Sequence, residues 1–311
     1  MKIKNKILIS TSSFGACGQQ PLRLLKEAGN QVIANPFGRK MTPAEVVKLG
    51  KDCIGIIAGV ELLNAAVLEA LPHLRCISRC GSGTDNIDLE KAKEFKIVVR
   101  NTPEGPTRAV AELTLGVILD ILRKISLRDR QIRQGKWNKE MGYLLQGKKV
   151  GILGLGRIGR AVAELLLRQD AKVAGSDIQP DKRWSKKNKV PLLSFRKLLR
   201  ESQILTIHIS GSPNNRHLIG QKEINSMPRG AYLINLSRGG IVDEQILYQA
   251  LKKGCLAGAA IDVFEEEPYT GPLRGLDNIV LTPHVGSYAS ETRLEMEIEA
   301  AKNLLEGLKR S

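Results

Sequence analysis

The sequence predicts an α/β protein whose two parallel β-sheets are covered by helices. Short runs of β-branched residues alternate with amphipathic helical stretches along the chain, which is the pattern of strand–helix–strand units. This alternation occurs in two successive series, and the length of 311 residues suits two domains of roughly 100–200 residues each. We therefore expect one parallel sheet in each of two domains.

The first series of elements ends near Arg100. Its predicted strands are Lys6–Ser10, Gln31–Asn35, Cys53–Ala58, Arg75–Arg79 and Ile97–Arg100. Its predicted helices include Pro21–Ala28, Pro43–Lys48 and Asn64–Leu71. These helices have apolar residues at helical spacing, so each is expected to pack one face on the sheet.

The second series begins near Lys149. Its predicted strands are Lys149–Leu153, Lys172–Ser176, Ile204–Ile209, Tyr232–Asn235, Gly258–Asp262 and Ile279–Leu281. Its predicted helices are Ile158–Gln169, Phe195–Glu201, Lys222–Ser226 and Glu244–Lys253. Six strands in strand–helix order are typical of a doubly wound sheet.

One long helix is predicted between the two series, over Pro106–Gln134. Proline is favoured in the first turn of a helix, because its missing N–H has no partner there anyway. Val110, Leu113, Val117 and Ile121 give this segment an apolar stripe. We expect the helix to pack in a core, and its length also suits a contact between subunits.

The last segment, Ala289–Leu308, is predicted to be a helix that folds back onto the first domain. The chain would then cross between the domains twice. The expected domains are residues 1–102 with 286–311 for one and residues 103–285 for the other. The cleft between two domains is the expected ligand site.

The chain is strongly basic, with a formal net charge of +16. Its lysines are scattered except for one dense run, Asp181–Lys189. No helix-turn-helix, zinc-finger or RNA-binding signature accompanies this run, so we expect a solvated basic surface that attracts anionic substrates. Nucleic-acid binding through Lys182–Lys189 is the weaker alternative.

The first residues and the cysteines indicate the compartment. The apolar run Ile7–Ile9 is too short for a signal peptide, and no stretch approaches the roughly 20 apolar residues of a membrane helix. We expect a cytoplasmic protein without a membrane partner.

The five cysteines form an odd number, which argues against a disulfide framework. Cys76 and Cys80 have no second Cys/His pair, so we interpret them as buried or loop thiols and predict no metal site.

A glycine-rich turn follows the first strand of the second series, in VGILGLGRIG at 150–159. Gly154 permits the tight turn, Gly156 lets the backbone approach a pyrophosphate, and Gly159 lets the next helix pack close to the sheet. Free N–H groups and the helix dipole favour negative charge at the start of that helix. The turn therefore predicts a dinucleotide site.

An acidic residue follows at the distance that such sites require. Asp177 ends the next strand, 23 residues after Gly154. Its carboxylate is suited to accept hydrogen bonds from the adenosine ribose and to repel a 2′-phosphate, which favours NAD over NADP. Lys182 and Arg183 lie nearby in the sequence and are expected to soften this preference.

Polar side chains follow three later strands of the second series. Arg238 lies in NLSRGGIVD, Glu267 in GAAIDVFEEEP and His284 in LTPHVGS. Loops at the carboxyl ends of the strands face the ligand crevice of a doubly wound sheet. Each residue alone has an ordinary structural explanation, such as a surface cation or a structural histidine. Their combination favours a catalytic site.

Six motifs occur along the chain: GSGTDNIDL at 81–89, TRAVAELTLG at 107–116, GKKVGILGLGRIGR at 147–160, INLSRGGIVDE at 234–244, AGAAIDVFEEEP at 257–268 and LTPHVGS at 281–287. With these motifs the chain resembles the D-isomer-specific 2-hydroxyacid dehydrogenase family, and within it the 3-phosphoglycerate dehydrogenase branch. The resemblance implies two doubly wound parallel-sheet domains, a Rossmann-type NAD-binding domain inserted in a flavodoxin-like substrate-binding domain. It also implies hydride transfer between NAD and a small anionic 2-hydroxy or 2-keto acid.

By this resemblance, Arg238, Glu267 and His284 form the catalytic trio. The guanidinium of Arg238 would grip the substrate carboxylate and polarise the neighbouring carbonyl. His284 would exchange a proton with the substrate oxygen. Glu267 would fix the tautomer of the imidazole and favour its charged form.

The resemblance assigns further contacts residue by residue. The substrate contacts are Arg79, Gly81, Ser82, Gly83, Arg238 and His284. The cofactor contacts are Gly154, Gly156, Arg157, Ile158, Gly159, Asp177, Leu236, Ser237, Arg238, Asp262, His284 and Gly286. Arg79 matches a basic residue that faces the phosphate in some phosphoglycerate-type members of the family.

The chain also departs from the family pattern. His208, Ile209 and Ser210 stand where the family often has His-x-Pro, and Asn215 stands where a threonine is frequent. Both changes are expected to alter cofactor affinity modestly. The Ala58–Gly59 region replaces a second arginine of vertebrate-like members, which weakens the case for 3-phosphoglycerate. The sequence stops after the last helix, so feedback through a C-terminal regulatory domain is not expected.

The leading expected substrate is 3-phosphoglycerate. Glyoxylate, hydroxypyruvate, sulfolactate and other short anionic 2-hydroxy acids are the alternatives. A homodimer is expected, because the long helix after the first hinge builds a dimer in the family. A binding protein that senses NAD(H), such as a corepressor, is the alternative of another class, because a fold alone does not imply turnover.

Overall fold

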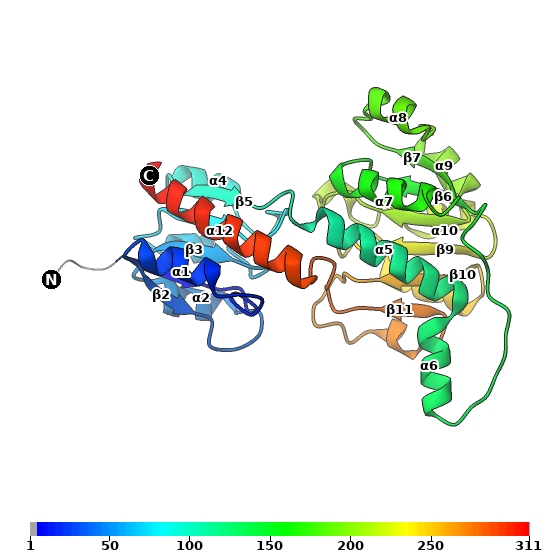
Figure 1. Cartoon of the computed structure of the whole chain (residues 1–311), viewed down its shortest axis with the longest axis horizontal. Helices are drawn as coiled ribbons and strands as arrows, with labels where there is room; N and C mark the ends of the chain where they lie inside the picture. Colours follow the sequence, from blue (N-terminus) through cyan, green and yellow to red (C-terminus); the bar gives the residue numbers. More distant parts are fainter. Residues whose placement is uncertain (1–4, 311) are drawn as a thin grey trace. The chain divides into compact units, whose positions relative to one another are not determined.

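The computed structural model describes residues 5–310, and these form two compact units (Figure 1). Unit 1 runs to Pro106 and resumes at Ser287, and unit 2 is Thr107–Gly286. Residues 103–106, which the sequence assigns to the second domain, belong to unit 1, because Gly105 lies against Met296 of the last helix. Gly286 belongs to unit 2, where its N–H donates to Asp262.

Unit 1 contains a five-stranded parallel sheet in the order β2-β1-β3-β4-β5. Its strands are β1 (Lys6–Ile9), β2 (Gln31–Ala34), β3 (Cys53–Ala58), β4 (Cys76–Arg79) and β5 (Val98–Asn101). Its helices are α1 (Gln20–Glu27), α2 (Pro43–Gly50), α3 (Ala65–Glu69), α4 (Leu89–Glu94) and α12 (Ser290–Arg310). The strand order is that of flavodoxin-like sheets, which confirms the expected class. The short helix α4 is absent from the sequence prediction.

Helices cover both faces of this sheet. Ile7 and Ile57 point to the face that α1 and α12 cover, whereas Leu8 and Ile56 point to the face that α2, α3 and α4 cover. The last helix therefore packs on unit 1, as the sequence predicts (red in Figure 1).

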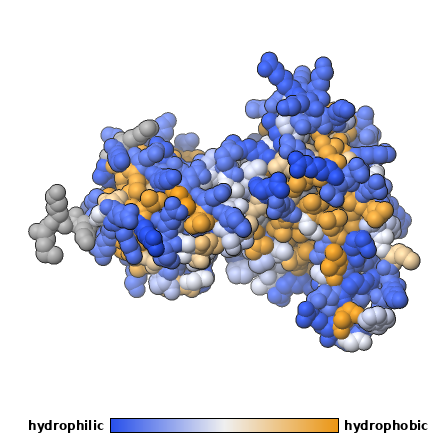
Figure 2. Space-filling model, viewed as in Figure 1, coloured by the Kyte–Doolittle hydropathy of each residue, from blue (hydrophilic) through white to orange (hydrophobic). Residues whose placement is uncertain are grey.

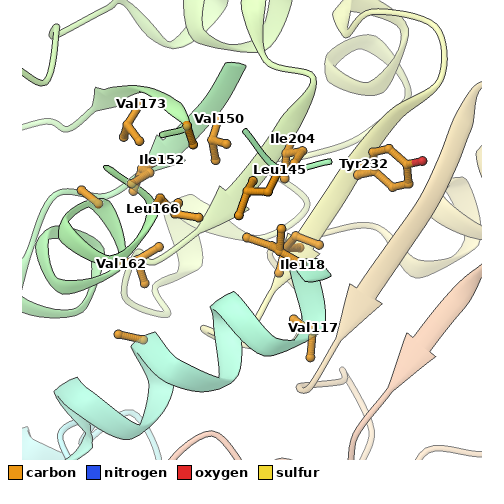
Figure 3. Close-up of a cluster of buried hydrophobic side chains, with 14 of the residues drawn as sticks. Val117, Ile118, Leu145, Val150, Ile152, Val162, Leu166, Val173, Ile204 and Tyr232 are labelled. Atoms are coloured by element: carbon orange, nitrogen blue, oxygen red, sulfur yellow. The ribbon is translucent and has the colours of Figure 1, made fainter. Parts of the chain in front are cut away.

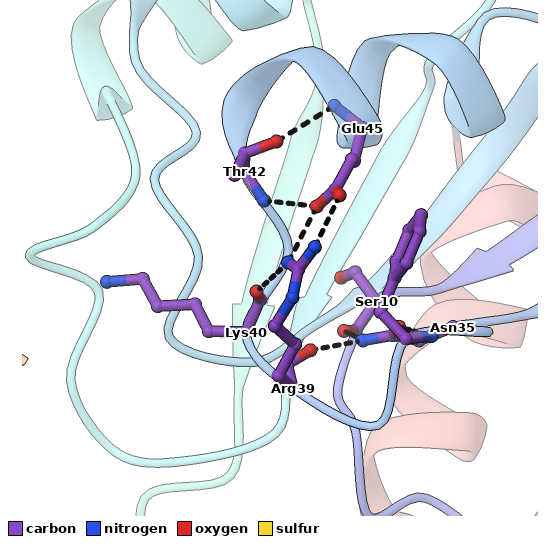
Figure 4. A network of polar contacts seen from close by, with 7 residues as sticks. Ser10, Asn35, Arg39, Lys40, Thr42 and Glu45 are labelled. Atoms are coloured by element: carbon purple, nitrogen blue, oxygen red, sulfur yellow. Dashed lines mark hydrogen bonds and ion pairs between the residues drawn. The ribbon is translucent and has the colours of Figure 1, made fainter. Parts of the chain in front are cut away.

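The start of α2 illustrates how polar side chains fix these elements (Figure 4). The Thr42 side chain accepts a hydrogen bond from the Glu45 N–H, and the Glu45 carboxylate accepts one from the Thr42 N–H, at 3.3 and 2.8 Å. This reciprocal cap satisfies two backbone donors at the helix start. Arg39 adds a bidentate ion pair to Glu45, which holds the preceding loop against the helix.

Unit 2 contains a six-stranded parallel sheet in the order β11-β10-β9-β8-β6-β7. Its strands are β6 (Lys149–Leu153), β7 (Lys172–Ser176), β8 (Ile204–Ile207), β9 (Ala231–Asn235), β10 (Leu256–Ile261) and β11 (Ile279–Leu281). Its α-helices are α5 (Pro106–Arg123), α6 (Ile125–Arg133), α7 (Arg157–Leu167), α8 (Lys182–Asn188), α9 (Phe195–Glu201), α10 (Gln221–Ser226) and α11 (Glu244–Lys252). Two short 3₁₀ turns, Pro213–Asn215 and Pro272–Gly275, complete the described elements.

A parallel bridge between Gly175 and Leu192 marks a seventh strand position beside β7. Including it, the order is that of a dinucleotide-binding sheet, with the reversal of strand order between β6 and β8. The Rossmann-type prediction is therefore confirmed. The third strand of that pattern is reduced to one bridge, which explains why the sequence gives no strand signal there.

The predicted single helix over Pro106–Gln134 is wrong, because the chain breaks it at Lys124. This residue has a left-handed φ of 55°, which ends α5. The Asp120 carboxylate accepts a hydrogen bond from the Ser126 N–H at 2.8 Å and so caps the start of α6. A new helix therefore starts in another direction (Figure 1).

The core of unit 2 lies on both faces of its sheet. On one face, Val150 and Ile152 of β6 pack with Val162 of α7 and Ile118 of α5 (Figure 3). On the other face, α9, α10 and α11 cover the strands. None of the helices that the structure describes is both long and apolar enough to cross a membrane.

Candidate active site

The glycine-rich turn lies between β6 and α7, at the point where the strand order reverses. Gly154 has a φ of 95°, and a Cβ there would lie 2.5 Å from the carbonyl oxygen of His208, so only glycine fits. A Cβ on Gly159 would overlap the carbonyl oxygen of Gly154. A Cβ on Gly156 would meet no atom within 4 Å, so the space before the helix start is open. This arrangement fits a pyrophosphate at the helix N-terminus.

Asp177 follows β7 and is tied to the glycine turn. Its carboxylate accepts hydrogen bonds from the Leu155 N–H at 2.6 Å and from the Gln179 N–H at 2.8 Å. It therefore holds the turn to the sheet in addition to the ribose contact that the sequence predicts.

The other predicted contacts of this turn differ in exposure. Arg157 is exposed in the first turn of α7, whereas the Ile158 side chain packs on the core.

The basic run of the sequence forms α8, whose first N–H groups bond to Asp181. Arg160 lies over the Trp184 ring, 5.4 Å from its centroid, and pairs with Asp181. Helix α8 is absent from the sequence prediction.

The loop after β9 carries Leu236, Ser237 and Arg238. The buried Asn235 side chain accepts hydrogen bonds from the N–H and the hydroxyl of Ser237, at 3.1 and 2.7 Å, and donates to the Arg238 carbonyl at 2.9 Å. The Arg238 guanidinium in turn donates to the Ser237 carbonyl at 2.7 Å. Asn235 thus fixes the backbone beneath Arg238, a contact that sequence reasoning missed.

His284 and Glu267 meet directly. The imidazole Nδ1 lies 2.9 and 3.0 Å from the two carboxylate oxygens of Glu267. Both side chains are partly exposed, at 36% for His284 and 27% for Glu267. With Nδ1 turned to the carboxylate, Nε2 is the nitrogen that is left to exchange a proton with a ligand.

The backbone around His284 is held by Asp262, which follows β10. The Asp262 carboxylate accepts hydrogen bonds from the Thr282 hydroxyl and from the N–H groups of Val285 and Gly286, at 2.6 to 2.8 Å. The Asp262 carbonyl accepts the His284 N–H. Burial raises the pKa of Asp262. The Asp262 carboxylate therefore fixes the backbone on either side of His284. Its predicted contact with the cofactor stays a prediction.

Four loops thus come together at one edge of the sheet of unit 2. A Cβ on Gly239 would overlap the carbonyl oxygen of Phe264, so the loop after β9 lies against the loop that carries Glu267. On its other side, a Cβ on Gly211 would lie 3.2 Å from Cγ of Arg238. Arg238 therefore lies between the loops after β8 and β10, and His284 follows β11 at the same edge.

The predicted substrate residues Arg79 and Gly81–Gly83 lie at the carboxyl end of β4 in unit 1. The Arg79 guanidinium donates to the carbonyl of Cys80 and lies over Gly81, whose φ is 152°. Ser82 and Gly83 are half-buried.

The chain is similar in sequence and in fold to known proteins. The model of the family "D-isomer specific 2-hydroxyacid dehydrogenase, NAD binding domain" matches residues 115–286. A glyoxylate reductase from Thermofilum pendens is 42% identical over 93% of this chain and 88% of its own length. The chain belongs to this family.

A D-3-phosphoglycerate dehydrogenase from Archaeoglobus fulgidus is 38% identical to this D-2-hydroxyacid dehydrogenase over 80% of the chain, which spans 48% of that relative. The crystal structure of the TT0316 protein from Thermus thermophilus has a TM-score of 0.89 at 33% identity, covering 98% of this chain and 97% of that one. A D-lactate dehydrogenase from Aquifex aeolicus, solved with NAD and lactic acid, has a TM-score of 0.84 at 25% identity and covers 98% and 96%. The family model that matches this chain is that of an NAD-binding domain, so NAD is the cofactor of this dehydrogenase.

Two further residues of this dehydrogenase border the nucleotide turn. Ile178, next to Asp177, is 98% exposed. His208 follows β8, and burial lowers its pKa to about 3, so the imidazole is neutral at pH 7. Its Nε2 pairs with the Thr206 hydroxyl at 2.8 Å. The sequence signal that could have pointed to Ile178 is an apolar residue directly after Asp177.

The cysteines of the first sheet are buried thiols, as expected. Burial raises the pKa of Cys76 to about 12 and that of Cys80 to about 11, so both stay protonated at neutral pH.

Proposed function

We propose that this dehydrogenase reduces a small anionic 2-keto acid to the D-2-hydroxy acid, and catalyses the reverse oxidation, with Arg238, Glu267 and His284 as its catalytic residues. The direct pairing of His284 with Glu267, beside the loop that carries Arg238, is the observation that carries the proposal. NAD supplies or accepts the hydride when bound.

Each residue then has one task in the reduction. The Arg238 guanidinium binds the substrate carboxylate and polarises the keto group. Nε2 of His284 gives its proton to the carbonyl oxygen as the carbonyl carbon gains the hydride. Glu267 holds the ring by Nδ1 and stabilises the protonated imidazole that starts the step.

The nucleotide would be held by residues around the glycine turn. Gly154, Gly156 and Gly159 leave room for the pyrophosphate, and the backbone of Arg157 and Ile158 offers N–H groups to it. Asp177 would accept the ribose hydroxyls and Ile178 would cover the adenine. Leu236, Ser237, Asp262 and Gly286 belong to the loops that would surround the nicotinamide.

Two substrates stand first. The net charge of +16 and the proposed contact of Arg79 with a distal phosphate favour 3-phosphoglycerate. The identity of 42% to a glyoxylate reductase favours glyoxylate or hydroxypyruvate. In both cases the amides of Ser82 and Gly83 would bind the carboxylate. The Gly81 N–H, which the resemblance also assigns to the substrate, is taken by the Arg79 carbonyl at 3.0 Å.

We also propose that two copies of the chain form a homodimer through α6 and the segment that follows it. Apolar side chains are exposed there: Ile125, Ile132, Trp137, Met141, Tyr143 and Leu144. Figure 2 shows orange side chains at this end of unit 2, below α5. Exposed apolar groups gathered in one region are typical of protein–protein contacts.

The decisive experiment is a kinetic screen with NADH. Glyoxylate, hydroxypyruvate and 3-phosphohydroxypyruvate are each supplied, and NADH oxidation is followed by absorbance. We expect turnover of at least one acid and a much higher kcat/KM for one of them. NADH binding in a calorimeter without turnover of any acid would instead favour an NAD(H)-sensing protein.

A further inference from the structure

The loop after β4 is held by two hydrogen bonds from the end of β5. The carbonyl oxygen of Gly81 accepts the Thr102 N–H at 3.0 Å. The carbonyl oxygen of Ser82 accepts the Asn101 side-chain amide, with Nδ2 at 2.7 Å. Both donors therefore pull successive carbonyl groups of the loop toward the same strand end.

These two bonds also determine where the next N–H groups point. In a planar trans peptide, the N–H of one residue lies antiparallel to the carbonyl of the residue before it. The N–H groups of Ser82 and Gly83 are therefore turned away from the end of β5. Over residues 5–310, neither N–H donates a hydrogen bond to another group of the protein. Two successive N–H groups on one side form a concavity that binds an anion.

The loop has little rigidity of its own. Gly81 and Gly83 lack a side chain, and glycine backbones adopt more conformations than those of other residues. The contact from Thr102 is made by its backbone, so any residue except proline supplies it. The contact from Asn101 needs its side chain, because only the amide NH₂ reaches the Ser82 carbonyl.

Asn101 is in turn fixed on both sides. It pairs with Arg79 in the ladder between β5 and β4. Its carbonyl accepts a hydrogen bond from the Asn303 side chain of α12 at 3.0 Å. The side chain that orients the loop therefore stands on a rigid strand, which is what precise positioning of a ligand contact requires.

We infer that Asn101 is a positioning residue, whose side chain aims the N–H groups of Ser82 and Gly83 at the substrate carboxylate. The inference rests on the proposed function for the identity of that carboxylate. Asn101 acts through the loop backbone and does not touch the reacting atoms.

The test uses two variants of the full chain and one matched control. Asn101→Ala removes the side-chain donor, and Asn101→Asp keeps the shape but replaces the donor by an acceptor. The control is Asn30→Ala, because Asn30 also donates its side-chain amide to a backbone carbonyl of unit 1, that of Leu25, at 3.0 Å. Oxalate, a dicarboxylate that resembles a short 2-keto acid, is titrated calorimetrically into the NADH-saturated proteins.

We expect the oxalate Kd and the KM for the 2-keto acid to rise about tenfold in both Asn101 variants, as expected for one lost hydrogen bond. The kcat should change less, the Kd for NADH should stay as in the wild type, and Asn30→Ala should behave as wild type. A merely structural role would lower the unfolding temperature of the Asn101 and Asn30 variants alike without this selective loss.

The inference is overturned if oxalate binds both Asn101 variants within twofold of the wild type, or if it does not bind the wild type at all. Oxalate binding by a wild type that turns over no 2-keto acid would refute the proposed function alone, since the calorimetric comparison still decides the role of Asn101. Asn101→Asp serves as the second variant should Asn101→Ala fail to fold.

Discussion

At the residue scale, His284 and Arg238 are positioned by neighbouring polar side chains that fix the backbone on either side of them. His284 stands on a segment that Asp262 binds three times, and Arg238 stands on a loop that Asn235 fastens. The sequence predicts Arg238, Glu267 and His284 as the catalytic trio through family motifs, and their catalytic roles stay a proposal. Asn235 and Asn101 could not be predicted, because an asparagine at a strand end is common and only contacts across the fold reveal its acceptor.

The proposed binding of the substrate carboxylate by Arg238 predicts a selective loss of activity when its guanidinium is replaced. We expect Arg238→Lys to lower kcat/KM roughly 10- to 100-fold, because a point charge replaces a planar fork of donors. Steady-state kinetics with the best 2-keto acid measure this effect. Arg229→Lys, an exposed position, is the control. Activity near the wild-type level in Arg238→Lys would contradict the assigned role.

The pairing of Glu267 with His284 predicts a second loss. Glu267→Gln keeps the shape but removes the charge beside Nδ1, so we expect kcat to fall roughly 100-fold or more. Stopped-flow turnover and a separate NADH titration measure it, and the NADH Kd should not change. The neighbouring, exposed Glu266→Gln is the matched control. Equal losses in both variants would argue against the pairing as the cause.

Burial of His208 predicts how stability depends on pH. Its pKa is lowered from the ordinary value of 6.5 to about 3 in the folded chain. Below pH 6.5 the unfolded chain therefore binds a proton that the folded chain does not. The fold should lose about 2 kcal/mol from this group by pH 5, and lose no more below about pH 3.

Chemical denaturation of wild type and His208→Gln between pH 7 and pH 5 measures this contribution. We expect a flatter profile for the variant. His73→Gln, at an exposed position, should keep the wild-type profile. Identical slopes for wild type and His208→Gln would show that the neutral His208 does not contribute.

At the scale of elements, the sequence predicted the strands of both sheets, because buried parallel strands are short apolar runs between helices. It failed where one residue changes the path of the chain. Lys124 in the left-handed region divides a continuous apolar pattern into α5 and α6, and nothing in the pattern marks the break. The short helices α4 and α8 were missed because their residues are mostly charged and give no apolar stripe.

The exposed apolar residues around α6 predict the oligomeric state. If they form the homodimer contact, Ile132→Glu should raise the dimer dissociation constant by at least about tenfold, because each copy loses a buried isoleucine. Light scattering over a dilution series measures it. Leu89→Glu, at the start of α4 in unit 1, should leave the constant unchanged. A monomeric wild type at all concentrations would refute the dimer.

At the scale of the whole molecule, the net charge of +16 acts on every anionic ligand. A positive field raises the encounter rate of anions, and salt screens it. If 3-phosphohydroxypyruvate is a substrate, its kcat/KM should fall by about tenfold as salt is raised. The value for glyoxylate, which carries one charge, should fall less. Equal salt dependence for both acids would mean that the field does not steer them.

The sequence by itself determined the two parallel sheets and the glycine turn, because local spacing of apolar residues and glycines fixes strands and helix starts. It also named Arg238, Glu267 and His284 as candidate catalytic residues. Only the tertiary structure decided that the Glu267 carboxylate meets Nδ1 of His284, that Asp177 holds the glycine turn, and that Asn101 directs the loop after β4. Those contacts join residues from separate loops, and their distances depend on how the strands pair, which no local pattern encodes.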